Sequence, residues 1–180
     1  MLYYPNRNRV HRVPGRRRGR LGRRPEYPAR VAGLHEEAGF DRLLVGQPAD
    51  AADPFAVANQ VLTTTSGLGV LLAHRPGSVA PTVVARQYAT LDAFHPGRVA
   101  MLVTADGDEA IQRRAGEFLD VVGLEWSSAE PFDYGGGFYR VAGGRSAVCP
   151  RGGRLPVYVS GTSAGAVRMG AGTPTSTPCG

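Results

Sequence analysis

Short apolar runs separated by amphipathic stretches constrain the fold of this chain more than any other feature. The runs lie at residues 41–46, 67–73 and 98–104, and a fourth follows at 155–160. Each is apolar through its centre instead of alternating, which is typical of strands buried on both faces of a parallel sheet. The sequence therefore predicts an α/β fold built from βαβ units.

The segments between the first three runs have helical periodicity. The strongest is Pro81–Phe94, whose apolar face is predicted to contain Val84, Tyr88, Leu91 and Phe94. Val99, in the next strand, is expected to pack against this face together with Val84 and Leu91.

Two further helices are predicted on either side of the first apolar run. Residues 29–38 form the first, with Val31 and Leu34 on one face, and Gly39 is expected to end it. The second opens at Asp53, which has a good N-cap side chain, followed by Pro54 at the first helical position.

The pattern becomes less regular after Asp106. Residues 110–119 are predicted to be helical, and Trp126 is expected in the core. Between 132 and 141, aromatic residues flank a glycine-rich turn, which indicates a β-hairpin.

The charge of the chain is unevenly distributed. Residues 1–24 contain nine arginines and no acid, whereas all 15 acidic residues lie beyond them. Because residues 1–28 lack apolar periodicity, we predict a disordered arginine-rich tail there. A basic arm for nucleic acid is the alternative, but no aromatic interleaving or recognition fold accompanies it, so nucleic acid is not expected as a partner.

Several other classes are disfavoured by the sequence. No run of 18 apolar residues suggests a membrane span, and Pro25-Glu26-Tyr27-Pro28 stands where a secretory signal would need an apolar core. The two cysteines, Cys149 and Cys179, form no CxxC motif, and the four histidines lack the spacing of metal ligands. We therefore expect a cytoplasmic protein without a metal centre.

Polar side chains follow three of the predicted strands, at the end where parallel α/β folds bind their ligands. These residues are His74 and Arg75 after the second run, Thr104 and Asp106 after the third, and Ser160, Gly161, Thr162 and Ser163 after the fourth.

The group at 160–163 is the most suggestive of binding chemistry. Small residues at a strand-to-helix turn let backbone N–H groups approach an anion, and Thr162 and Ser163 add hydroxyl donors. A phosphate site and an ordinary capped turn both remain open on this pattern.

Nearby side chains also have two interpretations. His74 and Arg75 offer an imidazole and a cation to a ligand, or form an ordinary loop with a salt bridge. Thr104 either binds a ligand or caps its strand. Asp106, together with the acids at 108 and 109, is interpreted as a solvated loop face in preference to a metal site.

Five stretches of this chain resemble the alkanesulfonate monooxygenase branch of the luciferase-like flavin enzymes. The specific part is HRPG at 74–77, then a helix ending in TLD at 90–92, then GR, an apolar strand and Thr104. The other stretches are AGFDRLLVGQ (38–47), DPF (53–55), EPFDYGGGFYRV (130–141) and LPVYVSGTSAGA (155–166). The likeness covers about residues 29–169.

The resemblance implies a TIM-type (β/α) barrel and an FMN-dependent monooxygenase. Such enzymes take reduced flavin from a partner reductase, react it with oxygen and, in the sulfonate branch, cleave a carbon–sulfur bond. It further implies that His74 and Arg75 lie beside the flavin, that Thr104 touches it and that Gly161, Thr162 and Ser163 hold its phosphate. A deazaflavin-dependent oxidoreductase of the same superfamily is the close alternative.

The chain also departs from the family pattern. A complete barrel has eight strands and about 250 residues, whereas the sequence predicts four strands in a partial barrel domain at 29–169, with a second disordered tail at 170–180. Ala51 replaces a cysteine, Met101 stands where a polar residue faces the flavin, and Ala105-Asp106 replaces Gly-Gly.

We therefore expect a fragment that binds flavin weakly and does not oxygenate sulfonates alone. A non-catalytic remnant of a truncated or frameshifted gene is the alternative. The substrate, the reductase and the presence of a homo-oligomer remain open.

Overall fold

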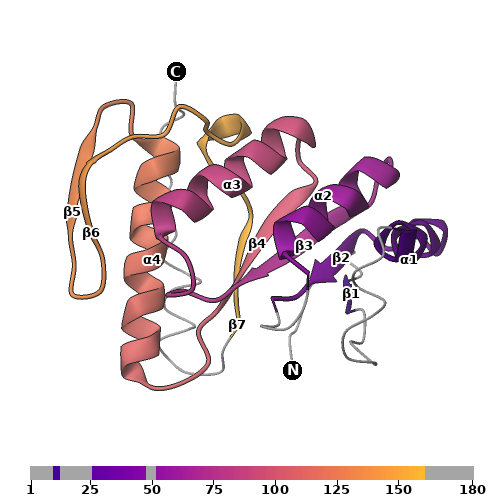
Figure 1. The fold of residues 1–180 in the computed structure, drawn as a ribbon, viewed down its shortest axis with the longest axis horizontal. Helices are drawn as coiled ribbons and strands as arrows, with labels where there is room; N and C mark the ends of the chain where they lie inside the picture. Colours follow the sequence, from indigo (N-terminus) through magenta and orange to yellow (C-terminus); the bar gives the residue numbers. More distant parts are fainter. Residues whose placement is uncertain (1–9, 13–25, 48–51, 161–180) are drawn as a thin grey trace. The chain divides into compact units, whose positions relative to one another are not determined.

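The computed structural model describes residues 10–12, 26–47 and 52–160. The chain divides into two compact units, residues 1–73 and 74–180. Figure 1 shows the helices and strands, with colours that follow the sequence from the N-terminus to the C-terminus. Helices alternate with parallel strands in both units, which confirms the predicted α/β fold class.

The described residues of the first unit form three parallel strands and two helices. Strand β2 (Arg42–Val45) lies between β1 (Val10–Arg12) and β3 (Gly69–His74), whose last residue belongs to the second unit. The helices are α1 (Glu26–Glu37) and α2 (Pro54–Thr64), and they pack against each other.

The predicted helix signals of this unit are confirmed. Asp53 caps α2 by accepting a hydrogen bond from the backbone N–H of Ala56 at 3.0 Å, and Pro54 occupies the first turn. Gly39 has a φ of 75°, the left-handed conformation that ends α1 at little cost for glycine. The predicted apolar face of α1 is wrong at Leu34, which is exposed, because small Ala32 provides the buried contact.

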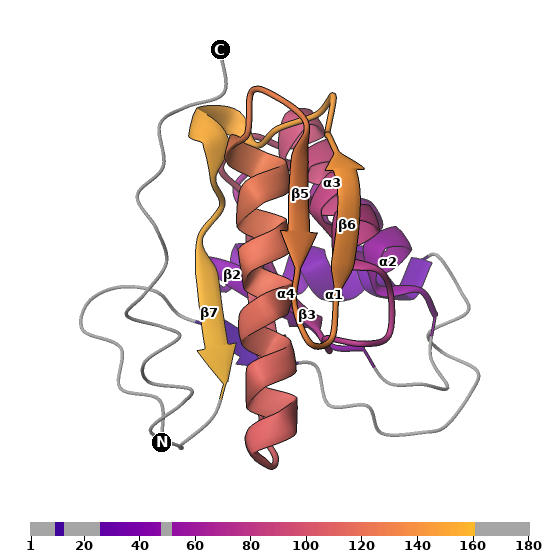
Figure 2. The ribbon, with the colours of Figure 1, turned by 90° about the vertical axis from the view of Figure 1, so that its left-hand side faces the viewer.

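The second unit joins a parallel strand pair to two packed helices and a hairpin. Strands β4 (Val99–Thr104) and β7 (Val157–Ser160) are parallel, and α3 (Pro81–Phe94) packs on α4 (Glu109–Ser127). Strands β5 (Phe132–Gly135) and β6 (Arg140–Gly144) form the predicted antiparallel hairpin. Figures 1 and 2 show this hairpin lying along α4, and the short helix η2 (Arg151–Gly153) precedes β7.

The core of the second unit lies around α3. Val84, Leu91 and Val99 are buried, as the sequence predicts. Trp126 is also buried, and its indole N–H donates to the carbonyl of Ala85 at 2.9 Å, which ties α4 to α3. Phe94 was predicted on the apolar face but is 70% exposed, because the last turn of α3 extends past the surface that covers Leu91.

A buried carboxylate connects the end of α3 to the segment before β7. Asp92 accepts hydrogen bonds from the N–H of Gly97 through Oδ1 and from that of Arg151 through Oδ2, both at 3.0 Å. Gly97 has a φ of 75°, so the turn that follows α3 favours glycine. The Asp of the TLD motif therefore has an architectural role.

Two boundaries differ from the sequence prediction. Helix α4 continues to Ser127, well beyond 119, because Val121, Val122 and Trp126 extend its buried face across Gly123. Residues 10–12 form a strand and α1 begins at Glu26, within the segment predicted to be disordered. The backbone of a strand forms its hydrogen bonds with another strand, here β2, which is distant in the sequence. Local periodicity therefore does not predict the strand at residues 10–12. Residues 161–180 lie outside the described residues.

Replacing Leu91 with Ala should lower the free energy of unfolding by about 2–5 kcal/mol, the cost of removing a buried leucine side chain. Urea unfolding of the purified chain measures the change. Phe94→Ala is the matched control, because Phe94 lies one turn away on the same helix and is exposed; its effect should stay below about 0.5 kcal/mol. Equal effects of the two substitutions would contradict this packing.

Replacing Asp92 with Asn should destabilise the chain by about 1–3 kcal/mol. The side-chain NH₂ of Asn would face one of the two backbone N–H groups, and two donors cannot form a hydrogen bond. Asp53→Asn is the control, since Asn caps a helix as well as Asp does. A wild-type midpoint for Asp92→Asn in thermal unfolding would show that the two hydrogen bonds contribute little.

Candidate functional site

The strand ends of the second unit bring several of the predicted site residues together. Thr104 and Ser160, the last residues of β4 and β7, are register partners. The Thr104 hydroxyl donates to the carbonyl of His74 at 3.3 Å, and the N–H of Ala105 donates to the carbonyl of Ser160 at the same distance. The carboxyl end of β4 therefore lies between the residue that ends β3 and the residue that ends β7.

The two faces of β4 differ at this end. Leu102 and Thr104 are partly exposed, whereas Met101 and Val103 are buried. Because side chains alternate along a strand, Thr104 lies on the more open face and Met101 on the covered one. Met101, which the resemblance aligns with a polar flavin-facing residue, is fully buried on the covered face.

The imidazole of His74 is packed in an apolar environment. It is 1% exposed and stacks on the Phe118 ring of α4, with 4.9 Å between centroids and an interplanar angle of 16°. Nε2 has no hydrogen-bond partner in the described part of the chain. Burial lowers the pKa of His74 to about 4, so the ring is neutral at pH 7 and its packing, more than its charge, shapes the strand end.

The loop after His74 forms a tight turn. The Ser78 hydroxyl donates to the carbonyl of Arg75 at 2.8 Å, and the backbone N–H of Ser78 approaches the same oxygen at 3.3 Å. Gly77 has a φ of 97°, which strongly favours glycine. The turn leaves Arg75 exposed beside the strand end.

The acidic residues after β4 have structural partners that the sequence analysis did not assign. Asp106 accepts a hydrogen bond from the Ser160 hydroxyl at 3.3 Å. Asp108 is the N-cap of α4 and accepts from the N–H of Ile111 at 2.9 Å. The position of Asp108 just before a helical pattern was a usable capping signal. No group of three or more potential metal-binding side chains occurs within the described ranges.

Three predicted site residues, Gly161, Thr162 and Ser163, lie outside the described residues. Their placement as a phosphate-binding turn stays a prediction. The structure describes the residue just before them, Ser160, at the same strand edge as Thr104.

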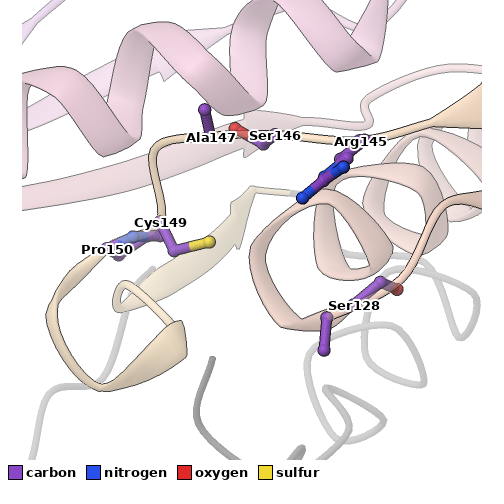
Figure 3. Close-up of a pocket in the computed structure, with 7 residues that line it drawn as sticks. Ser128, Arg145, Ser146, Ala147, Cys149 and Pro150 are labelled. Atoms are coloured by element: carbon purple, nitrogen blue, oxygen red, sulfur yellow. The ribbon is translucent and has the colours of Figure 1, made fainter. Parts of the chain in front are cut away.

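A pocket of about 600 Å³ lies elsewhere in the second unit (Figure 3). It is lined by Ser128, Ala129, Arg145, Ser146, Ala147, Cys149 and Pro150. Ser128 follows the end of α4, whereas Thr104 and Asp106 precede its start. Since α4 has 19 residues and a helix rises 1.5 Å per residue, the two ends of α4 are about 28 Å apart. The pocket and the candidate site are distinct.

The stability of the chain should fall on mild acidification because of His74. The pKa of about 4 in the folded state lies below the ordinary value of about 6.5 in the unfolded chain. Between these values the unfolded chain binds more protons, so stability is lost as the pH falls from about 6.5 to 4.

Urea unfolding at pH 7 and pH 4.5 measures this loss. His74→Phe keeps an aromatic ring against Phe118 and should lose about 2–3 kcal/mol less than the wild type between the two values. Identical losses in the two proteins would show that His74 is protonated readily in the folded chain.

Comparison with known proteins identifies the family. Residues 1–173 match the model of a family described as luciferase-like monooxygenase.

None of the described helices is both long and apolar enough to cross a membrane.

Solved structures with similar folds include three enzymes. An F420-dependent secondary alcohol dehydrogenase in complex with an F420-acetone adduct has 24% sequence identity and a TM-score of 0.69, over 77% of this chain and 48% of that chain. A long-chain alkane monooxygenase has 17% identity and a TM-score of 0.71, over 82% and 47%. The EDTA monooxygenase from Chelativorans sp. BNC1 has 20% identity and a TM-score of 0.68, over 78% and 45%.

The chain spans about half the length of these structures. At such identities the likeness concerns the fold, and it confirms the expected partial TIM-type (β/α) barrel. Because the family model matches nearly the whole sequence, the chain belongs to the luciferase-like monooxygenase family.

Proposed function

We propose that this chain forms the cofactor-binding part of a flavin-dependent monooxygenase of the alkanesulfonate type. The observation that carries the proposal is that Thr104, the His74 carbonyl and Ser160 lie together at the carboxyl ends of neighbouring strands. Ligands of parallel α/β folds bind at this edge. Membership of the luciferase-like family supports a flavin as the ligand.

The described residues fit a flavin in two respects. Thr104 is partly exposed, and its only described hydrogen bond is a long one of 3.3 Å, so its hydroxyl is available to a ligand. Arg75 places an exposed cation beside the same edge, which suits an anionic cofactor. The carboxylate of Asp106, bonded to Ser160, disfavours an anion at Ser160 itself, so the phosphate is assigned further along the turn.

The roles of the residues follow from these positions. The Thr104 hydroxyl exchanges its long bond to the His74 carbonyl for a hydrogen bond to the flavin, and the turn that contains Arg75 lies beside it. Gly161, Thr162 and Ser163 hold the phosphate through backbone N–H and hydroxyl groups. His74 supports the turn, since its neutral ring is packed on Phe118. Reduced FMN, when bound, supplies the electrons for the reaction with oxygen.

The proposed protein needs two partners. A flavin reductase supplies reduced FMN, and a small organic substrate, an alkanesulfonate in this proposal, is oxygenated and releases sulfite. Sulfite release with a reductase, reduced nicotinamide and oxygen tests the reaction. We expect the 180-residue chain alone to release none, because one wall of a site does not exclude water from the reacting flavin.

A deazaflavin is the second candidate cofactor. Two of the similar structures, a secondary alcohol dehydrogenase and a tetrahydromethanopterin reductase from Methanopyrus kandleri, are described as F420-dependent. Parallel titrations with FMN and with F420 distinguish the two proposals, since the favoured cofactor has the lower dissociation constant.

The Thr104→Val variant tests the site within the chain. Removing a ligand hydrogen bond should raise the dissociation constant for FMN roughly two- to tenfold, as measured by quenching of flavin fluorescence. Thr90→Val is the matched control, because the Thr90 hydroxyl donates to the Arg86 carbonyl of its own helix at 2.8 Å. Equal affinities of both variants and the wild type would exclude Thr104 from the site.

A further inference from the structure

The tip of the β5–β6 hairpin is held by a carboxylate of α4. Glu117 accepts hydrogen bonds from three successive backbone N–H groups: Gly137 through Oε1 at 2.9 Å, and Phe138 and Tyr139 through Oε2 at 2.7 and 3.1 Å. The carboxylate also closes the space at Gly136, where a Cβ would collide with Glu117. The hairpin tip is therefore a fixed part of the second unit.

The electrostatics of Glu117 support this arrangement. Partial desolvation raises its pKa, but the N–H groups of Phe138, Gly137 and Tyr139, together with Arg113, outweigh this effect and lower the pKa below its ordinary value. The ionised carboxylate is therefore the form that the hairpin tip stabilises. Three residues further along α4, Asp120 accepts a hydrogen bond from the Tyr134 hydroxyl at 3.1 Å and provides a second attachment.

The held tip contacts the turn that follows β3. The Tyr139 ring lies 6.4 Å from that of Phe118, which in turn stacks on His74. The Tyr139 hydroxyl is buried without a well-formed hydrogen bond in the described part of the chain. Burial raises its pKa, while Arg114 and the nearby N–H of Gly77 act in the opposite direction.

Arg114 forms a second contact with the same turn. Its guanidinium lies over the Phe138 ring, 4.9 Å from the centroid. A Cβ on Gly77 would lie 3.0 Å from Arg114 Nη1 and 3.3 Å from its Cδ. The turn therefore packs directly against the Arg114 side chain, which would have to shift to admit a Cβ at Gly77, and the hairpin tip, α4 and Gly77 form one packed group.

From this geometry we infer that Glu117 and Tyr139 are positioning residues for the turn at 74–78. Glu117 fixes the hairpin tip, and Tyr139 in turn supports Gly77 and the His74–Phe118 stack. The consequence for flavin binding rests on the proposed function, which assigns Arg75 and His74 to the cofactor site. Neither Glu117 nor Tyr139 touches the cofactor in this account.

Amide hydrogen exchange of the full chain, followed residue by residue, tests the coupling. Glu117→Gln and Tyr139→Leu should each speed exchange at Gly77 and Ser78 by about tenfold, the consequence of weakening local support by roughly the equivalent of one hydrogen bond. Tyr139→Leu removes the aromatic ring that lies against Phe118.

Two control variants separate positioning from a general loss of stability. Glu36→Gln alters a carboxylate of the same kind in the first unit, where Glu36 accepts from the N–H groups of Ser66, Gly67 and Leu68. Tyr134→Phe loosens the hairpin at Asp120, away from Gly77. Both controls should leave exchange at 77 and 78 within about twofold of the wild type.

The outcome at the turn decides the inference. Faster exchange at Gly77 and Ser78 only in Glu117→Gln and Tyr139→Leu supports it; unchanged exchange, or equal acceleration in the controls, overturns it. A parallel FMN titration keeps the proposed function separate. If the wild-type chain binds no FMN, the proposed function fails while the exchange result still decides the positioning role.

Discussion

The packing of α3 against α4 and β4 is the interaction on which the candidate site depends. Tyr88, Phe118 and Trp126 are buried in this layer, and the indole of Trp126 is bonded across it to the backbone of α3. Phe118 also supports the His74 ring at the end of β3. Because the strand ends carry the polar residues, their positions follow from how this apolar layer is filled.

Carboxylates bound to backbone N–H groups fix the loops around this layer. Glu36 holds the residues before β3, Asp92 joins the turn after α3 to η2, and Glu117 holds the hairpin tip. Each carboxylate satisfies donors that have no partner in a helix or sheet. Charge-assisted bonds of this kind are stronger than neutral ones, so irregular segments become well-defined parts of each unit.

Local patterns in the sequence predicted most of the regular elements. Asp53-Pro54 and Gly39 gave helix ends through capping chemistry that depends only on neighbouring residues. The strand β1 and the partners of Asp92 were not predictable in this way, because their hydrogen bonds join residues far apart in the chain. The same limit applies to Glu117, because a glutamate on a helix acquires its role only when the hairpin lies beside it.

The sequence predicted only part of the candidate site, because some of its contacts join residues far apart in the chain. The rule that ligands bind at carboxyl ends of parallel strands correctly brought Thr104 and Ser160 together. The direction of the His74 ring, toward Phe118, depends on α4 and could not be inferred from the HRPG motif. The pocket lined by Ser128 and Arg145 was not predicted, because it forms away from the strand ends that the sequence motifs marked.

The central claim is that a flavin binds at the carboxyl end of β4. Titration of the ¹⁵N-labelled chain with FMN, followed by backbone amide chemical shifts, tests it most directly. We predict that the largest changes in chemical shift occur at Gly77, Ala105 and Ser160, with little change at Ala147 and Cys149 in the pocket. Largest shifts at the pocket residues, or no saturable shifts at the strand edge, would contradict the claim.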